Sequence, residues 1–300
     1  MVFTVVIILF GIYFFKNRDQ FQVLFDIPFL NVVLIAVMQL LVISTNILFL
    51  WIFLLVKEKK DSWLTLTKVT FRSSIINFFG FLQGGVGYRA YYLKRFKNIS
   101  LADFAGLMFI NYWAVFVISS LLGTVGLIIQ GNILSSYISS LLALFFAGVI
   151  IALSALSFIP KGISNFFSWH QLIKVSQLFD HIRHNKKFLL IFMVVALLQY
   201  VSSTLLFYLT LNAIGANLTI GGLLVYSSLA QFSILIALTP AAIGLREGLL
   251  IILQDTVGVN TQEIILSATL ERAVYFVLLI ILALFLSGRI KKPTKNQLQN

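Results

Sequence analysis

The amino-acid sequence predicts an all-α polytopic membrane protein with six full spans and two re-entrant hairpins in an inverted repeat. Three observations support this fold class: the composition, the lengths of the apolar runs, and a short glycine–arginine motif that occurs twice. Of the 300 residues, 60% are hydrophobic and only 11% are charged, whereas soluble domains carry roughly 25% charged residues. The long apolar runs indicate helices, because the strands of a membrane barrel would alternate polar and apolar residues.

The charge and cysteine content narrow the function classes. The net charge is +12, but the basic residues lie in short segments between apolar runs, as in loops that face anionic lipid rather than nucleic acid. The chain has no cysteine, which excludes disulfides, thiolate metal sites and cysteine nucleophiles. No polar stretch is long enough for a soluble domain, so residues 1–300 are expected to form a single membrane domain.

Six apolar runs are predicted to span the membrane. The first is short for a span, which needs about 20 residues. It nevertheless lacks the basic start and the small-residue cleavage site of a signal peptide. The predicted spans are 2–15, 29–56, 104–129, 133–159, 188–211 and 264–286.

The basic residues also predict the orientation. They cluster in segments expected to face the cytoplasm, namely 57–60, 94–97, 161–187 and 289–295. Within these, 161–187 alternates apolar and basic residues and is expected to form an amphipathic linker on the cytoplasmic leaflet, and 287–300 a cytoplasmic tail. Both termini are therefore placed in the cytoplasm, while 130–134 and 212–220 carry no charge and are expected outside.

Two less regular regions, 62–92 and 221–253, each begin and end on one side of the membrane. At 31 and 33 residues, neither is long enough for two crossings and a turn. Each is therefore expected to enter partway and return, the first from the cytoplasmic side and the second from outside. The repeats then cover approximately 1–130 and 133–286 in opposite orientations, an arrangement typical of secondary transporters.

The repeated motif lies where these hairpins should turn. It reads Gly84-Gly-Val-Gly-Tyr-Arg89 in the first region and Ala241-Ala-Ile-Gly-Leu-Arg246 in the second. We expect each turn to open a half-helix with an arginine in its first turn. The free N–H groups, the helix dipole and the guanidinium all favour a phosphate there. The predicted hairpin-tip residues are Gly84, Gly85 and Pro240, and the predicted substrate-binding residues are Arg72, Asn77, Gly87, Arg89, Gly244 and Arg246.

A simpler interpretation is that these arginines serve only to pair with acidic groups. Glu247 and Glu271, together with Arg272, lie in the apolar C-terminal half. The two glutamates either pair with arginines or act as a protonatable relay that couples transport to a proton.

Motifs for other chemistry are absent from the sequence. There is no Walker motif, no serine elbow and no paired-carboxylate motif. His181 and His184 lack a third ligand at a suitable spacing. We therefore expect no metal, no cofactor and no enzymatic activity.

The hairpin residues resemble those of a known family. The order Pro-x-x-x-Gly-x-Arg-Glu, from Pro240 to Glu247, looks like the late motif of the flippase-like membrane domain of lysylphosphatidylglycerol synthases. Arg272 matches an arginine of that family's last helix, and Arg72, Asn77 and 84–89 resemble an earlier stretch. The resemblance implies a polytopic helical fold that translocates a lipid with a charged or glycosylated head group.

The sequence departs from this family in two respects. No synthase catalytic domain follows the last span, so no aminoacyl transfer is expected. The first motif has Gly-Val-Gly where many members have an acidic residue beside glycine, which argues against a symmetric, acid-based mechanism.

The leading hypothesis is a multi-pass inner-membrane flippase or transporter for an anionic phospholipid or a polyprenyl-phosphate lipid. Membrane lipids would be its partners, and nucleic acid would not. Three alternatives are a secondary transporter of a small anionic solute, a membrane enzyme acting on lipid head groups, and a membrane partner of a separately encoded lipid-modifying enzyme. A homo-oligomer is compatible with each of them.

Overall fold

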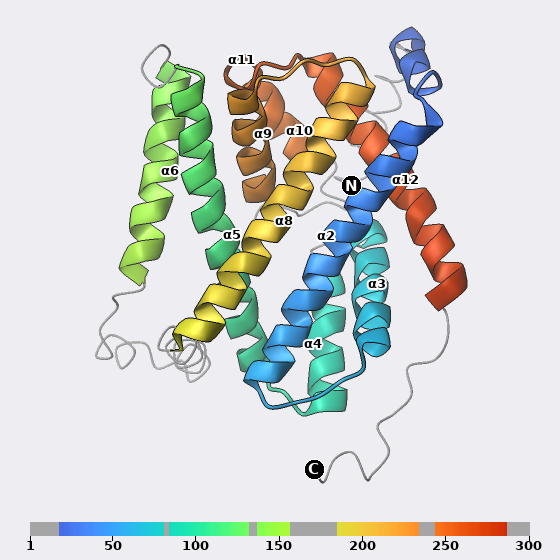
Figure 1. Ribbon diagram of the computed structural model, residues 1–300, viewed down its shortest axis with the longest axis vertical. Helices are drawn as coiled ribbons and strands as arrows, with labels where there is room; N and C mark the ends of the chain where they lie inside the picture. Colours follow the sequence, from blue (N-terminus) through green and yellow to red (C-terminus); the bar gives the residue numbers. More distant parts are fainter. Residues whose placement is uncertain (1–17, 81–83, 132–136, 157–184, 234–243, 287–300) are drawn as a thin grey trace.

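The computed structural model describes residues 18–80, 84–131, 137–156, 185–233 and 244–286, and all regular elements in this part of the chain are helical (Figure 1). Four of the helices are long and apolar enough to cross a membrane: α2 (Phe29–Val56), α5 (Leu101–Ile129), α8 (Lys186–Ala213) and α12 (Thr261–Leu286). A 3-10 helix, η1 (Arg18–Leu24), precedes α2, and α6 (Tyr137–Leu156) follows α5.

These helices confirm the predicted positions of the apolar runs. Helix α2 coincides with the predicted span 29–56, and α5, α8 and α12 contain the spans predicted in their regions. Helix α6 lies within the predicted span 133–159. The predicted first span 2–15, nearly all of the linker 161–187 and the tail 287–300 lie outside the described residues.

The first predicted hairpin is a pair of packed helices, α3 (Trp63–Phe79) and α4 (Gly84–Lys97). Helix α3 begins where the Ser62 hydroxyl accepts the Thr65 N–H group at 3.2 Å, a standard N-cap. It ends at Gly80. Because the backbone of Gly80 is extended, this region is not a continuous rod.

The second predicted hairpin also contains a break. It comprises α9 (Ile220–Phe232) and the short α10 (Leu245–Ile252), which is followed by α11 (Gln254–Val257). Gly244 precedes α10 with a φ of +84°, a conformation that side chains rarely tolerate. Pro240 lies outside the described residues. In Figure 1, α3 and α4 occupy the lower half of the molecule, and α9 and α10 the upper half.

Helices α5 and α9 pack backbone against backbone. A Cβ atom on Gly126 would lie 2.7 Å from the carbonyl oxygen of Gly221, and a Cβ on Gly221 would lie 2.7 Å from that of Gly126. Further along the pair, the rings of Phe116 and Phe232 stack at 4.9 Å between centroids. Small residues commonly permit such close approach between membrane helices.

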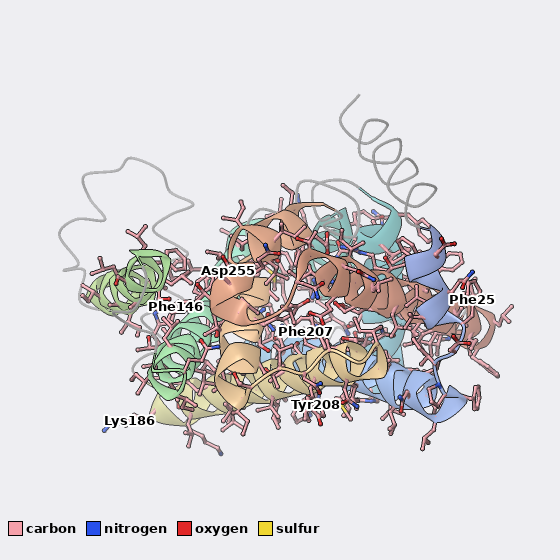
Figure 2. The ribbon with its side chains drawn as sticks, turned by 90° about the horizontal axis from the view of Figure 1, so that it is seen from above. Phe25, Phe146, Lys186, Phe207, Tyr208 and Asp255 are labelled. Atoms are coloured by element: carbon pink, nitrogen blue, oxygen red, sulfur yellow. The ribbon has the colours of Figure 1, made fainter. Side chains whose placement is uncertain are left out.

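The apolar side chains divide between an interior and an outer surface. Phe207 points into the bundle, whereas its neighbour Tyr208 lies at the outer edge of α8 (Figure 2). Many exposed side chains on the long helices are apolar. A surface of this kind suits contact with lipid, where helices satisfy their own backbone hydrogen bonds.

Candidate functional site: a charged cavity between the hairpins

A cavity of about 290 Å³ lies between α2, α3, α4, α8, α10 and α12. Its apolar wall is formed by Val42, Ile43, Phe78 and Leu206. Its polar wall is formed by Gln39, Asn46, Thr70, Ser73, Ser74, Asn77, Arg89, Arg246, Glu271, Arg272 and Tyr275. Both predicted hairpins therefore contribute an arginine to one polar cavity.

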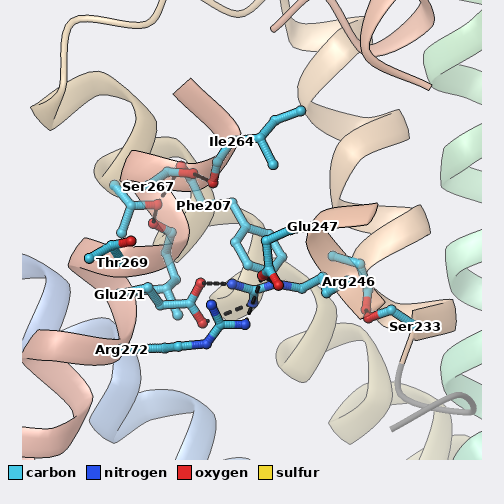
Figure 3. Close-up of polar contacts among 12 residues, drawn as sticks. Phe207, Ser233, Arg246, Glu247, Ile264, Ser267, Thr269, Glu271 and Arg272 are labelled. Atoms are coloured by element: carbon cyan, nitrogen blue, oxygen red, sulfur yellow. Dashed lines mark hydrogen bonds and ion pairs between the residues drawn. The ribbon is translucent and has the colours of Figure 1, made fainter. Parts of the chain in front are cut away.

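Arg246 is held by a bidentate ion pair. Its two terminal nitrogens donate to the two carboxylate oxygens of Glu271 at 3.1 and 2.8 Å (Figure 3). The guanidinium also lies over the ring of Phe207, 5.6 Å from the centroid. Parallel hydrogen bonds of this type fix the geometry of both groups. They tie α10 to α12.

Glu247 accepts hydrogen bonds from three sides. Its carboxylate accepts the N–H of Gly244 at 2.8 Å, Arg272 at 2.7 Å and the Nε of Arg246 at 3.3 Å. Glu247 is 8% exposed, so these bonds compensate for much of the cost of burying its charge. Two arginines and two glutamates thus form a network of zero net charge.

Arg89 differs from the other cavity arginines. Its Nε atom is buried without a hydrogen-bond partner. In the part of the chain that the structure describes, no carboxylate pairs with its guanidinium. Because the neighbouring charges cancel, Arg89 gives the cavity an excess positive charge. An anion is the ligand that such a charge favours.

The first hairpin is fixed by hydrogen bonds at its turn. The Asn77 Oδ1 accepts the N–H of Gly85 at 2.7 Å, and the Ser73 hydroxyl donates to the carbonyl of Gly85 at 2.8 Å. A Cβ on Gly85 would lie 2.0 Å from the carbonyl oxygen of Ser73. Glycine is therefore required here for the close approach of α3 and α4. Asn77 has this structural contact in addition to its place in the cavity wall.

Two other buried polar groups line the cavity without a full set of partners. The Gln39 Nε2 donates to the backbone carbonyl of Glu271 at 2.7 Å, which leaves its Oε1 buried and without a partner. The Thr70 hydroxyl is also buried and without a partner. A polar ligand in the cavity would satisfy such atoms, which are costly when left unpaired.

The site matches the sequence expectations in part. The cavity brings together Asn77, Arg89, Arg246, Glu271 and Arg272, all of which the sequence assigns to the site. The expected arginine in the first turn of each half-helix is confirmed for Arg246. It is wrong for Arg89, because α4 begins at Gly84 and its first turn ends before that residue.

Three other predicted binding residues, Arg72, Gly87 and Gly244, do not line the cavity. Gly87 is exposed on α4, and a Cβ atom there would meet nothing within 4 Å; the close approach is made by Gly85. Pairing with glutamate is confirmed for Arg246 and Arg272, and a proton relay through Glu247 or Glu271 stays a prediction.

The polar wall on α3 was predicted only in part, because the sequence assigns Asn77 to the site but not Thr70, Ser73 or Ser74. Thr70, Ser73, Ser74 and Asn77 follow the spacing i, i+3, i+4, i+7 and lie on one helical face. This polar stripe within a predicted membrane hairpin is the sequence signal from which the wall could have been predicted. Within the described ranges, no cluster of histidines and acidic residues could hold a metal ion.

Long apolar helices around a charged cavity define a multi-pass membrane protein. Comparison with known families gives a more specific assignment: the family described as lysylphosphatidylglycerol synthase TM region matches residues 1–283. The chain belongs to this family, as its hairpin motifs suggested. Among curated proteins no match was found.

Proposed function

We propose that this protein moves a lipid with an anionic head group, a phospholipid or a polyprenyl-phosphate lipid, between the leaflets of the inner (cytoplasmic) membrane. The observation that carries the proposal is Arg89, a cavity arginine with no acidic partner among the described residues. The phosphate of the head group would bind at Arg89 and be surrounded by the polar side chains of α2 and α3. The membership of a family of lipid-associated membrane domains supports a lipid as the ligand.

The arrangement of the hairpins supports alternating access. The first hairpin lies in the half of the molecule where α2 and α4 end (Figure 1). The basic residues follow the end of α2 or belong to the last turn of α4, namely Lys57, Lys59, Lys60, Lys94, Arg95 and Lys97. By the positive-inside rule this half faces the cytoplasm. The second hairpin then enters from outside, in keeping with an inverted repeat of residues 1–130 and 133–286, six full spans, and termini in the cytoplasm.

The Arg246–Glu271 pair would have a supporting role in this mechanism. The pair keeps a second guanidinium in the cavity wall, but its positive charge is neutralised by Glu271. The excess positive charge of the cavity therefore comes from Arg89 alone and matches one negative charge of a phosphate. The lipid would leave chemically unchanged, because transfer of a head group between leaflets needs no bond to be broken. The protein is accordingly proposed to be a transporter and not an enzyme.

The test is a leaflet-exchange assay in liposomes with acyl-labelled phosphatidylglycerol and a membrane-impermeant quencher. Hydrogen bonds to charged groups contribute about 1.5–3 kcal/mol, so Arg89→Ala should slow exchange about 10- to 100-fold. Arg95→Ala, an exposed arginine on the same helix, is the matched control and should exchange lipid at the wild-type rate. Equal rates for Arg89→Ala and the wild type would overturn the proposed site.

Two further measurements separate the rival functions. Uptake of radiolabelled glycerol phosphate into the same liposomes, without lipid exchange, would instead indicate a transporter of small anionic solutes. Mass spectrometry of the recovered lipid would reveal any chemical change, and a new lipid species would indicate an enzyme.

A further inference from the structure

Four aromatic rings connect the cavity to the outer surface of the protein. Phe78 on α3 and Tyr275 on α12 line the cavity. The next residues along each helix, Phe79 and Phe276, are 60% and 41% exposed. Ring-centroid distances are 5.7 Å for Phe78–Tyr275, 5.1 Å for Phe78–Phe79, and 6.1 Å for both Phe78–Phe276 and Phe79–Phe276. We call this group the aromatic seam.

The aromatic seam lies where one face of α12 becomes exposed. One turn before Tyr275, Glu271 is held by Arg246 and its carbonyl accepts the Gln39 amide. Beyond Phe276 the side chains of Val277, Ile280, Leu284 and Phe285 are exposed, and the lower end of α12 lies apart from α3 in Figure 1. The helix is therefore held by polar contacts above the seam, whereas below it one face is exposed and Leu278, on the other face, packs into an apolar core.

A lipid bound by its phosphate needs such an apolar opening. Moving each CH₂ group of an acyl chain from hydrocarbon to a polar cavity costs about 0.8 kcal/mol, so the chains must remain in the bilayer while the head group is enclosed. Contacts between phenylalanine rings can separate without leaving hydrogen-bonding groups unpaired, and acyl chains can replace them at little cost. A small water-soluble anion would have no need of this opening.

We propose that the aromatic seam between α3 and α12 is the lateral portal for the acyl chains of the transported lipid. Phe78 and Tyr275 form its inner edge, and Phe79 and Phe276 its outer edge. This inference rests on the proposed function, since it specifies how a lipid rather than a soluble anion reaches the cavity.

The absence of cysteine from the chain permits a direct test. In Phe79→Cys/Phe276→Cys, a short, reducible bifunctional thiol reagent would link α3 to α12 across the seam. We expect the link to slow exchange of acyl-labelled phosphatidylglycerol at least 10-fold, and reduction of the link to restore the wild-type rate. The reduced form of the same variant thereby controls for folding.

A matched control pair lies elsewhere on the exposed surface. The rings of Trp51 on α2 and Trp63 on α3 are 6.4 Å apart, and the residues are 39% and 48% exposed. Linking Trp51→Cys/Trp63→Cys should leave the exchange rate unchanged. Wild-type exchange by the linked Phe79/Phe276 variant would overturn the portal and leave the transport function standing.

If the protein exchanges no lipid at all, the proposed function is refuted. A second measurement then tests the portal by itself. Phosphatidylglycerol with a diazirine in its acyl chain would be photoactivated in nanodiscs that contain the protein. Labelling of Phe78 or Tyr275 that disappears on linking the seam would support the portal. A lack of labelling at both residues would overturn it.

Discussion

The two hairpins carry the same short motif but place their arginines in different electrostatic surroundings. In the second hairpin, Arg246 is in the first turn of an eight-residue helix and is paired with two glutamates. In the first, Arg89 lies further along a 14-residue helix, and no carboxylate in the described part of the chain pairs with it. The aligned glycines differ as well, since Gly87 lies within α4 and Gly244 precedes α10 with a φ of +84°. A repeated motif therefore does not specify one backbone arrangement, and the surrounding acids decide whether its arginine is structural or available to a ligand.

The largest expected effect on stability concerns Arg246, the arginine that is paired with glutamates. Arg246→Ala should lower the free energy of unfolding by about 3–5 kcal/mol, because it leaves buried acidic groups without their partner. Thermal unfolding of the purified protein in detergent measures this loss. The double variant Arg246→Ala/Glu271→Ala should lose less than the sum of the two single variants, since each removes the same interaction. Additive losses would contradict a coupled pair.

The next largest effect concerns the turn of the first hairpin. Gly85→Ala should cost about 1–3 kcal/mol of stability, as overpacking does, because the new Cβ would overlap the Ser73 carbonyl. Gly87→Ala is the control: its Cβ meets nothing within 4 Å, and alanine is favoured over glycine within a helix by roughly 0.5–1 kcal/mol. A lower unfolding temperature for Gly87→Ala than for Gly85→Ala would refute this packing.

A smaller effect is expected at the start of the second hairpin's α10. Gly244 has a φ of +84°, and a left-handed conformation costs other residues about 1–2 kcal/mol. Gly244→Ala should lower the unfolding temperature accordingly, whereas Gly248→Ala, with open space around its Cβ, should not. Equal unfolding temperatures for the two variants would show that the turn does not require glycine.

The smallest expected effect on stability concerns Arg89, and it tests most directly whether the two arginines differ in role. Arg89→Ala should change the free energy of unfolding by less than about 0.5 kcal/mol, or raise it, because removal of an unpaired cation leaves no acid unpaired. The same variant should lose most of its lipid exchange. Calorimetry beside the liposome assay tests both statements, and a large loss of stability would assign Arg89 a structural role instead.

Composition and apolar run length were sufficient to predict the four long apolar helices of the described part of the chain. Helix α2 matches its predicted range at both ends, because a long apolar run in a membrane protein has few alternatives to a helix. The break at Gly244 was also predicted, since glycine supplies the backbone freedom that it requires. In the first region the predicted motif 84–89 lies within α4, and α3 ends before Gly80.

The details of the site were less accessible from the sequence. The motif alone gives no sign that Glu271, on a helix distant in the sequence, reaches Arg246 and not Arg89. The contribution of Gln39 depends on where α2 lies beside α12, which is a tertiary property. The position of Arg89 beyond the first turn of α4 depends on where that helix begins, and helix ends are difficult to place from sequence.

The glycine contact between α5 and α9 has a consequence for movement. With Gly126 and Gly221 in backbone contact, no side chain fits between these two helices at this point, and we expect α5 to move together with α9, the first helix of the second hairpin. Displacement during a working cycle is then left to elements outside this pair, above all α12, one face of which is exposed below the aromatic seam. The fixed pair would serve as the frame against which those elements swing.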